Sequence, residues 1–257
     1  IDPVFNNQAT GTVNHNSGLL RFDRGGTDAG NYTVASGATL QFNGGTRSIS
    51  GNVIGAGNVS FTGSTVNYDL TGAYSIGGIT TASFAHNVVS TLDFTGTTSL
   101  GTSYVQEGNG TTVTFQAVPT LTNLTAINSN YGNTSFPAGT TFPALTTLSK
   151  TQAGTLDFAN SNLNLTSYTQ TAGVVTGSGT ITIPSGGTFN WGGGTLGGTG
   201  TLSTPVGATT NITGATALAN TRTWNNGGSA SPAMGGHNSS LDIATGALLN
   251  NLSSGVI

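Results

Sequence analysis

The sequence predicts an all-β fold, a parallel β-helix (β-solenoid) of about 11 coils with roughly 20–26 residues in each. A phrase of one apolar, one polar and one aromatic residue recurs along the chain. Glycine, asparagine and serine separate its copies, and residues that favour helices are scarce. The copies are Leu20-Arg21-Phe22, Leu40-Gln41-Phe42, Val66-Asn67-Tyr68, Leu92-Asp93-Phe94, Val113-Thr114-Phe115, Leu156-Asp157-Phe158 and a weaker one, Thr134-Ser135-Phe136.

The spacing of the phrase defines the expected coils. Its aromatic residues lie 20 to 26 residues apart, about 23 on average, and such a period is typical of repeat architectures. Each coil is expected to hold two or three short strands, and its residues to lie about 4.8 Å from their counterparts in the next coil. About 11 coils would then rise roughly 50 Å. Divided by eye, the first seven coils are 4–26, 27–50, 51–72, 73–97, 98–119, 120–143 and 144–162.

The composition supports strands in place of helices. The chain has 41 glycines, one glutamate and one lysine, whereas its abundant threonine favours strands. After about residue 160 the strand-like pieces shorten, so we expect one solenoid over 1–257 with a changed cross-section there. The alternative is an antiparallel β-sandwich, for which Asn43-Gly44, Asn109-Gly110 and Asn226-Gly227 would be hairpin turns.

The charge pattern excludes several classes of function. Only 5% of the residues are charged and the net charge is −3, against about 25% charged residues in an ordinary soluble domain. The five basic residues are scattered, which argues against nucleic-acid binding. We find no apolar run of 18 residues, so no membrane span is expected. The absence of cysteine rules out disulfides and thiolate metal sites.

No catalytic, cofactor or metal site is predicted. The segment 192–197 matches G-x-G-x-x-G, but Gly198-Thr199-Gly200-Thr201 cannot form the helix that a dinucleotide site requires. The sequence Gly25-Gly26-Thr27-Asp28 is a truncated copy of a calcium-binding repeat, and a surface turn is expected there. Three histidines lack companions at short spacing and are expected at the surface or at corners: His15, His86 and His237.

Any enzymatic reading depends on the carboxylates Asp69 and Asp93, which lie about one coil apart. If Tyr68 is aligned with Phe94, the two acids stand diagonally, roughly 7–8 Å apart, a separation that suits an inverting glycosidase. Asp157 is more than two coils further on. We expect the pair to be ordinary exposed acids, and therefore no enzyme.

Two further expectations concern the surface. The middle residues of the phrase form one polar but irregular outward ladder, without the regular threonine array that ice binding would suggest: Arg21, Gln41, Asn67, Asp93, Thr114, Ser135, Asp157 and Asn190. Five aromatic side chains would be candidates for stacking on sugars if exposed, although most aromatic residues are expected in the core: Tyr68, Tyr104, Tyr131, Trp191 and Trp224.

The stretch Gly51-Asn52-Val53-Ile54-Gly55-Ala56-Gly57-Asn58-Val59-Ser60-Phe61 resembles the repeats of large bacterial exoproteins. So does the Gly-Thr-Leu tract at 192–202 with Val206-Gly207-Ala208-Thr209 after it. The class comprises autotransporter passengers and filamentous-haemagglutinin-like adhesins, which fold as right-handed parallel β-helices. The resemblance covers most of the chain in style, and it implies a secreted or surface-exposed protein. It carries over no catalytic residue.

We therefore expect a structural or adhesive extracellular β-solenoid that forms a fibre, shaft or surface layer. Neither terminus has a helix or charge cluster typical of a cap, and bare coil ends expose strand edges. End-to-end self-association, or continuation into further coils, is expected. The alternative is a carbohydrate-binding or carbohydrate-cleaving β-helix, with surface glycans as partners. No cofactor is expected in either case.

Overall fold

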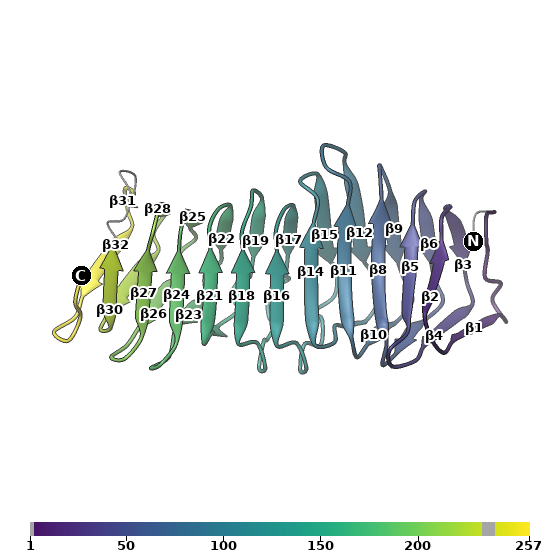
Figure 1. Cartoon of the computed structure of the whole chain (residues 1–257), viewed down its shortest axis with the longest axis horizontal. Coiled ribbons are helices and arrows are strands. Elements are labelled where there is room, and N and C mark those ends of the chain that lie inside the picture. The colour runs from purple at the N-terminus through teal and green to yellow at the C-terminus, as the bar shows by residue number, and fades with distance from the viewer. Residues whose placement is uncertain (1–2, 233–239) are drawn as a thin grey trace.

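The computed structural model describes residues 3–232 and 240–257. In these residues the chain forms 32 strands and no helix. The strands lie in four sheets, in which neighbouring strands run parallel. Figure 1 shows the result as a rod, in which the strands lie across the long axis and the two ends of the chain lie at opposite ends. The predicted β-solenoid of about 11 coils is confirmed.

Sheets B and C run the full length of the rod, with 11 strands in each. Sheet B consists of β2 (Leu19–Phe22), β5 (Thr39–Asn43), β8 (Asn58–Gly63), β11 (Ile79–Phe84), β14 (Ser103–Glu107), β16 (Ala126–Ser129), β18 (Thr147–Lys150), β21 (Ser167–Gln170), β24 (Thr188–Trp191), β27 (Thr209–Ile212) and β30 (Ser229–Pro232). Sheet C consists of β3 (Gly26–Asp28), β6 (Arg47–Ile49), β9 (Asn67–Leu70), β12 (Ser90–Phe94), β15 (Thr111–Phe115), β17 (Asn133–Ser135), β19 (Thr155–Asp157), β22 (Val174–Thr176), β25 (Gly194–Leu196), β28 (Ala215–Leu218) and β31 (Ser240–Ile243).

The third side of the rod differs between its two halves. Sheet A serves the first five coils, and sheet D begins at residue 163. The strands of sheet A are β1 (Thr12–His15), β4 (Asn31–Val34), β7 (Val53–Gly55), β10 (Tyr74–Ile76) and β13 (Thr98–Ser99). The strands of sheet D are β20 (Leu163–Asn164), β23 (Thr180–Thr182), β26 (Thr201–Thr204), β29 (Thr223–Asn226) and β32 (Leu248–Asn251).

The core consists of columns in which each inward side chain packs on its counterpart in the next coil. In sheet C the rings of Phe94, Phe115, Phe136 and Phe158 are stacked with centroids 5.0, 5.1 and 5.6 Å apart. A second stack of Phe22, Phe42 and Phe61 belongs to sheet B, with centroids 5.9 and 5.6 Å apart. Parallel pairing in register brings like side chains together, because neighbouring strands lie only about 4.8 Å apart.

The recurring phrase does not form one ladder, which corrects the alignment proposed from sequence. Leu40-Gln41-Phe42 pairs with Val59-Ser60-Phe61 in sheet B, whereas the later copies belong to sheet C. The copy at 66–68 is displaced by two residues, since Leu92 pairs with Tyr68 and Phe94 with Leu70. The two 26-residue gaps on either side of Tyr68 therefore mark a change of sheet and a shift of register. The true period follows from register partners in sheet C, which are 19 to 25 residues apart.

The turn candidates of the sandwich alternative lie at corners of the solenoid. The dipeptide 43–44 lies at the end of β5, 109–110 lies between β14 and β15, and 226–227 lies at the end of β29. In each case the next strand in the chain belongs to another sheet, or pairs in parallel. The antiparallel sandwich is therefore wrong, because an Asn-Gly pair also suits the tight corner of a coil.

A ladder of glycines allows the coils to stack at the corner that follows sheet C. A Cβ atom built on Gly51 would lie 1.9 Å from the carbonyl oxygen of Gly30, and one on Gly72 would lie 2.1 Å from that of Gly51. Gly96 continues the series at 2.2 Å from the Gly72 oxygen. The backbones touch here, so no side chain fits between them.

Two arginines replace apolar side chains inside the rod. Arg47 is 1% exposed and forms an ion pair with Asp28, which is fully buried. Its guanidinium also donates to the carbonyls of Phe5, Arg24 and Gly25. Arg222, likewise 1% exposed, donates to the carbonyls of Gly197 and Gly177 at 2.5 and 2.7 Å. Backbone oxygens from neighbouring coils thus partner charges that would be costly to bury alone.

The glycine ladder yields a test of the stacking. Gly72→Ala should lower the free energy of unfolding by about 1–3 kcal/mol, the range for overpacking a tight site, since the new methyl group meets a backbone oxygen that cannot move aside. Gly197→Ala is the matched control, because the nearest atom there is the end of the Asn220 side chain at 3.2 Å. Urea unfolding of both variants checks this, and equal stability of the two would contradict the close approach.

Candidate functional site

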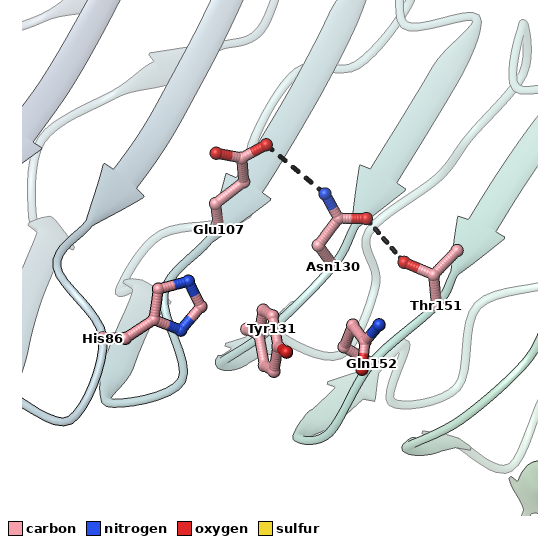
Figure 2. Close-up of a pocket in the computed structure, with 6 residues that line it drawn as sticks. All are labelled: His86, Glu107, Asn130, Tyr131, Thr151 and Gln152. Atoms are coloured by element: carbon pink, nitrogen blue, oxygen red, sulfur yellow. Dashed lines mark hydrogen bonds between the residues drawn. The ribbon is translucent and has the colours of Figure 1, made fainter.

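A groove crosses the corners where the chain passes from sheet B to sheet C, near the middle of the rod. Its volume is about 310 Å³. Six side chains line it, shown in Figure 2: His86, Glu107, Asn130, Tyr131, Thr151 and Gln152. They come from four successive coils, so the groove follows the long axis of the molecule.

One wall of the groove is residues 85–89 between β11 and β12, the longest of these corners among those that the structure describes. Asn87 adopts a left-handed conformation there, with φ of 61°. Its side-chain oxygen accepts a hydrogen bond from the side-chain amide of Asn109 in the next coil at 2.8 Å, and its backbone N–H donates to the side-chain Oδ1 of Asn109. Asparagine tolerates this conformation better than most residues. The corner thereby holds His86 outward, edge to face with Tyr131 at 4.7 Å between ring centroids and 87° between planes.

A chain of hydrogen bonds forms the opposite wall. Glu107 accepts bonds from the hydroxyl of Ser83 at 3.0 Å and from the amide of Asn130 at 3.3 Å. The side-chain Oδ1 of Asn130 accepts in turn from the hydroxyl of Thr151 at 2.5 Å. Figure 2 shows the links from Glu107 to Thr151 running along the coils above the Tyr131 ring. Each side chain of this wall is therefore fixed by its neighbour.

Lys150 lies beneath the groove as the last residue of β18. Its side chain is turned inward, and Nζ donates to the carbonyls of Asn130, Gln152 and Ala153 at 3.1, 2.8 and 3.0 Å. Burial lowers the pKa of Lys150 to about 8. Asn130 and Gln152 both line the groove, so this one ammonium group ties together two of its corners.

Sequence reasoning missed Glu107, Asn130 and Lys150, and predicted only that His86 lies at the surface or a corner, which is confirmed. A signal was nevertheless present. Glu107 is the only glutamate and Lys150 the only lysine of the chain, and single charged residues in a neutral repeat break its pattern. The period alone does not predict that Glu107 and Lys150 lie near one groove, because they belong to different coils.

The aspartates proposed from sequence lie elsewhere, on the outward face of sheet C. Asp69 and Asp93 pair directly in register, so the diagonal arrangement at roughly 7–8 Å is wrong, as is the separation inferred from it for an inverting mechanism. The cause is the two-residue shift at Tyr68. Asp69 accepts a bond from the Thr95 hydroxyl at 2.8 Å, and Asp93 accepts one from Thr114.

The remaining candidates from the sequence lie outside the groove or outside the described residues. The expected surface turn at 25–28 is wrong, since Asp28 belongs to β3 and its carboxylate pairs with Arg47 inside the rod. His15 lies beside the carbonyls of Gly18 and Thr39 at 3.0 and 3.1 Å, and His237 lies outside the described residues. The segment 192–197 contains strand β25, and the next element is the strand β26, not a helix.

The polar residues expected as one outward ladder are divided between two sheets. Arg21, Gln41 and Asn190 belong to sheet B, whereas Asp93 and its successors Thr114, Ser135 and Asp157 pair in register in sheet C. Of the five aromatic candidates for sugar stacking, four are core residues with no exposed surface: Tyr68, Tyr104, Trp191 and Trp224. Only Tyr131 reaches the outside.

Comparison of the chain with protein-family models, curated proteins and solved structures found no match. Within the described residues, no group of three or more histidine, aspartate or glutamate side chains gathers as a metal site would require. The search for membrane-spanning helices among them was also negative. The candidate site therefore rests on its geometry.

The pKa of Lys150 predicts a pH dependence of stability. Its pKa lies below the usual 10.5 in the folded protein, so between pH 8 and 10 the unfolded chain binds more protons. Lys150 therefore contributes a rise with pH to the free energy of unfolding over this interval, by about 1 kcal/mol after allowance for solvent screening. The buried tyrosines, whose pKa values burial raises, contribute an opposing fall near pH 10 in the wild-type protein and in a Lys150 variant alike. Lys150→Met should remove the rise, and chemical unfolding from pH 7 to 10 measures it. Identical slopes for the two proteins would refute this role of burial.

The paired aspartates give a second test. Like charges opposite each other on a sheet are destabilising, so Asp69→Asn and Asp93→Asn should each remove the repulsion, and the double variant should gain little more. The expected coupling is a few tenths of a kcal/mol, diminished by salt. A double-mutant cycle in low and high salt measures it. Strict additivity at low salt would show that the two carboxylates are not neighbours.

Proposed function

We propose that this chain is a structural β-solenoid, a segment of an extracellular or cell-surface shaft or fibre that is extended by stacking coil on coil. The resemblance of residues 51–61 and 192–202 to bacterial exoprotein repeats supports an adhesin-like, secreted setting. The small number of basic groups on the exterior supports it as well. Of the five basic residues, Arg47, Lys150 and Arg222 are buried in the rod, so the surface has little positive charge with which to select an anionic partner.

The observation that carries the proposal is the last coil. Inward positions that are closed elsewhere lie open there: Ile243 pairs with the fully buried Leu218 but is itself 46% exposed. Leu249 pairs with the buried Trp224 and is only partly covered. Among the described strands, β31 and β32 each have one neighbour, so backbone groups along their outer edges remain available for pairing.

Val256 shows how a further layer would attach. Its N–H donates to the carbonyl of Gly228 at 2.9 Å, and its carbonyl accepts from Ala230 at 2.8 Å. These two hydrogen bonds join Val256 to the outer edge of β30 as a parallel strand of the next coil would. The residues that follow β32 thus already add to sheet B in register.

The opposite end of the rod is partly covered. Ala29 and Gly30 both donate to the carbonyl of Asn7 at 2.8 and 2.9 Å, as Thr71 and Gly72 do to that of Ile49. Asn7 is therefore the counterpart of Asp28 one coil earlier. Phe5 stacks on Phe22 with ring centroids 4.7 Å apart. The expectation of two bare ends is thus wrong at this one: residues 5–11 cover the edge of sheet C, while β1 and β2 keep open edges.

Stacking predicts concentration-dependent, end-to-end association. Ile243→Asp should lower the association constant by at least about tenfold. Stacking would bury the new carboxylate without a partner, which costs more than about 1.4 kcal/mol. Val206→Asp is the matched control, since Val206 is 65% exposed at a corner on the side of the rod. Sedimentation velocity and negative-stain electron microscopy over a concentration series measure the effect.

Two outcomes would contradict the proposal. A wild-type protein that remains monomeric at high micromolar concentration would show that its coil ends do not stack. Disruption of the particles by Val206→Asp as much as by Ile243→Asp would show that the copies associate through their sides.

A further inference from the structure

Tyr131 is an exception among the aromatic residues. The chain has 19 phenylalanine, tyrosine and tryptophan residues, and all but Phe5 and Tyr131 are buried. Phe5 packs against the core at the end of the rod. Tyr131 alone directs its ring into an outer groove. The apolar surface of this ring stays in contact with water, so it lacks the favourable free energy that the core rings gain from burial. A ligand that covers the ring would supply this burial and gain the same free energy.

The corner that carries Tyr131 is unlike its neighbours. The neighbouring corners 108–110, 151–154 and 171–173 carry no aromatic residue, so the stacking of coils does not require a ring at this position. Two coils away, the corner at 85–89 brings His86 against the ring. The ring is therefore held in one orientation before any ligand arrives, and preorganisation of this kind reduces the entropic cost of binding.

The polar groups of the groove select the chemistry of a ligand. Glu107 is the one carboxylate among the lining residues, and the nearby ammonium of Lys150 is turned inward to three carbonyls. No lysine or arginine lines the groove, which disfavours phosphate, sulfate or an acidic peptide. The wall offers carboxylate, amide and hydroxyl groups in alternation, and a ligand rich in hydroxyl groups satisfies both donors and acceptors.

We propose that this groove binds a neutral saccharide, with one pyranose ring stacked on Tyr131 and its hydroxyl groups bonded to Glu107, Asn130 and Gln152. The volume of about 310 Å³ lies at the lower end of ligand sites, as suits one or two sugar units. The groove runs along the rod and is open at the surface, so a longer chain can extend past it. Binding by this groove is independent of end-to-end stacking.

Saturation-transfer difference NMR provides the test, with maltotriose, cellotriose and N,N′-diacetylchitobiose as probes and tetramethylammonium as the cationic alternative. At least one saccharide should bind with a millimolar dissociation constant, the strength expected of a small, partly exposed ligand. Tyr131→Ala should weaken binding about tenfold and Tyr131→Phe by no more than about twofold, because the ring supplies the stacking surface. Glu107→Gln should also weaken it.

Val206→Ala is the control, an exposed apolar truncation away from the groove, and circular dichroism establishes that each variant remains folded. Saccharide binding that survives Tyr131→Ala would place the site elsewhere and overturn the proposal. Binding of tetramethylammonium alone would identify a cation site in its place. The absence of binding by all three saccharides at millimolar concentration would also overturn it.

Discussion

Every residue of this rod must tolerate its counterpart one coil away at a single strand spacing, about 4.8 Å. Where the counterparts are phenylalanines, the result is a stack such as Phe94 on Phe115. Where two backbones meet at a corner, the result is a glycine such as Gly72. Where a cation takes an inward position, as Arg47 or Lys150 does, backbone carbonyls of adjacent coils surround it. The same spacing therefore determines the core, the corners and the location of the charges.

The spacing explains why the fold class was predictable and the register was not. The recurring apolar–polar–aromatic phrase indicates which side chains point inward, and its spacing is sufficient to predict parallel coils of about the observed length. It does not state to which sheet a copy belongs. Val59-Ser60-Phe61 is the partner of the copy at 40–42, whereas the sequence pattern favours the copy at 66–68 because its tyrosine continues the series. Only the pairing of the neighbouring strands decides between such alternatives. The predicted alignment therefore places Asp69 and Asp93 two residues out of register, whereas they pair directly.

The groove could not be predicted from the period, because it arises where the period is broken. The corner at 85–89 is longer than the corners beside it, and Tyr131 is an aromatic residue where the next corners along the rod have none. They meet because two coils bring His86 and Tyr131 within 4.7 Å between ring centroids. A repeat supplies a regular surface, and departures from the repeat mark the positions where the sequence serves something other than stacking.

The register of sheet C can be measured directly, since Asp69 and Asp93 are the one pair of aspartates that face each other across neighbouring described strands. We would label aspartate with ¹³C at Cα and record dipolar correlations on frozen protein. We expect an Asp–Asp contact at roughly 5 Å that disappears in Asp93→Asn. Absence of this contact in the wild-type protein, as a diagonal arrangement at roughly 7–8 Å would produce, would contradict stacking in this register.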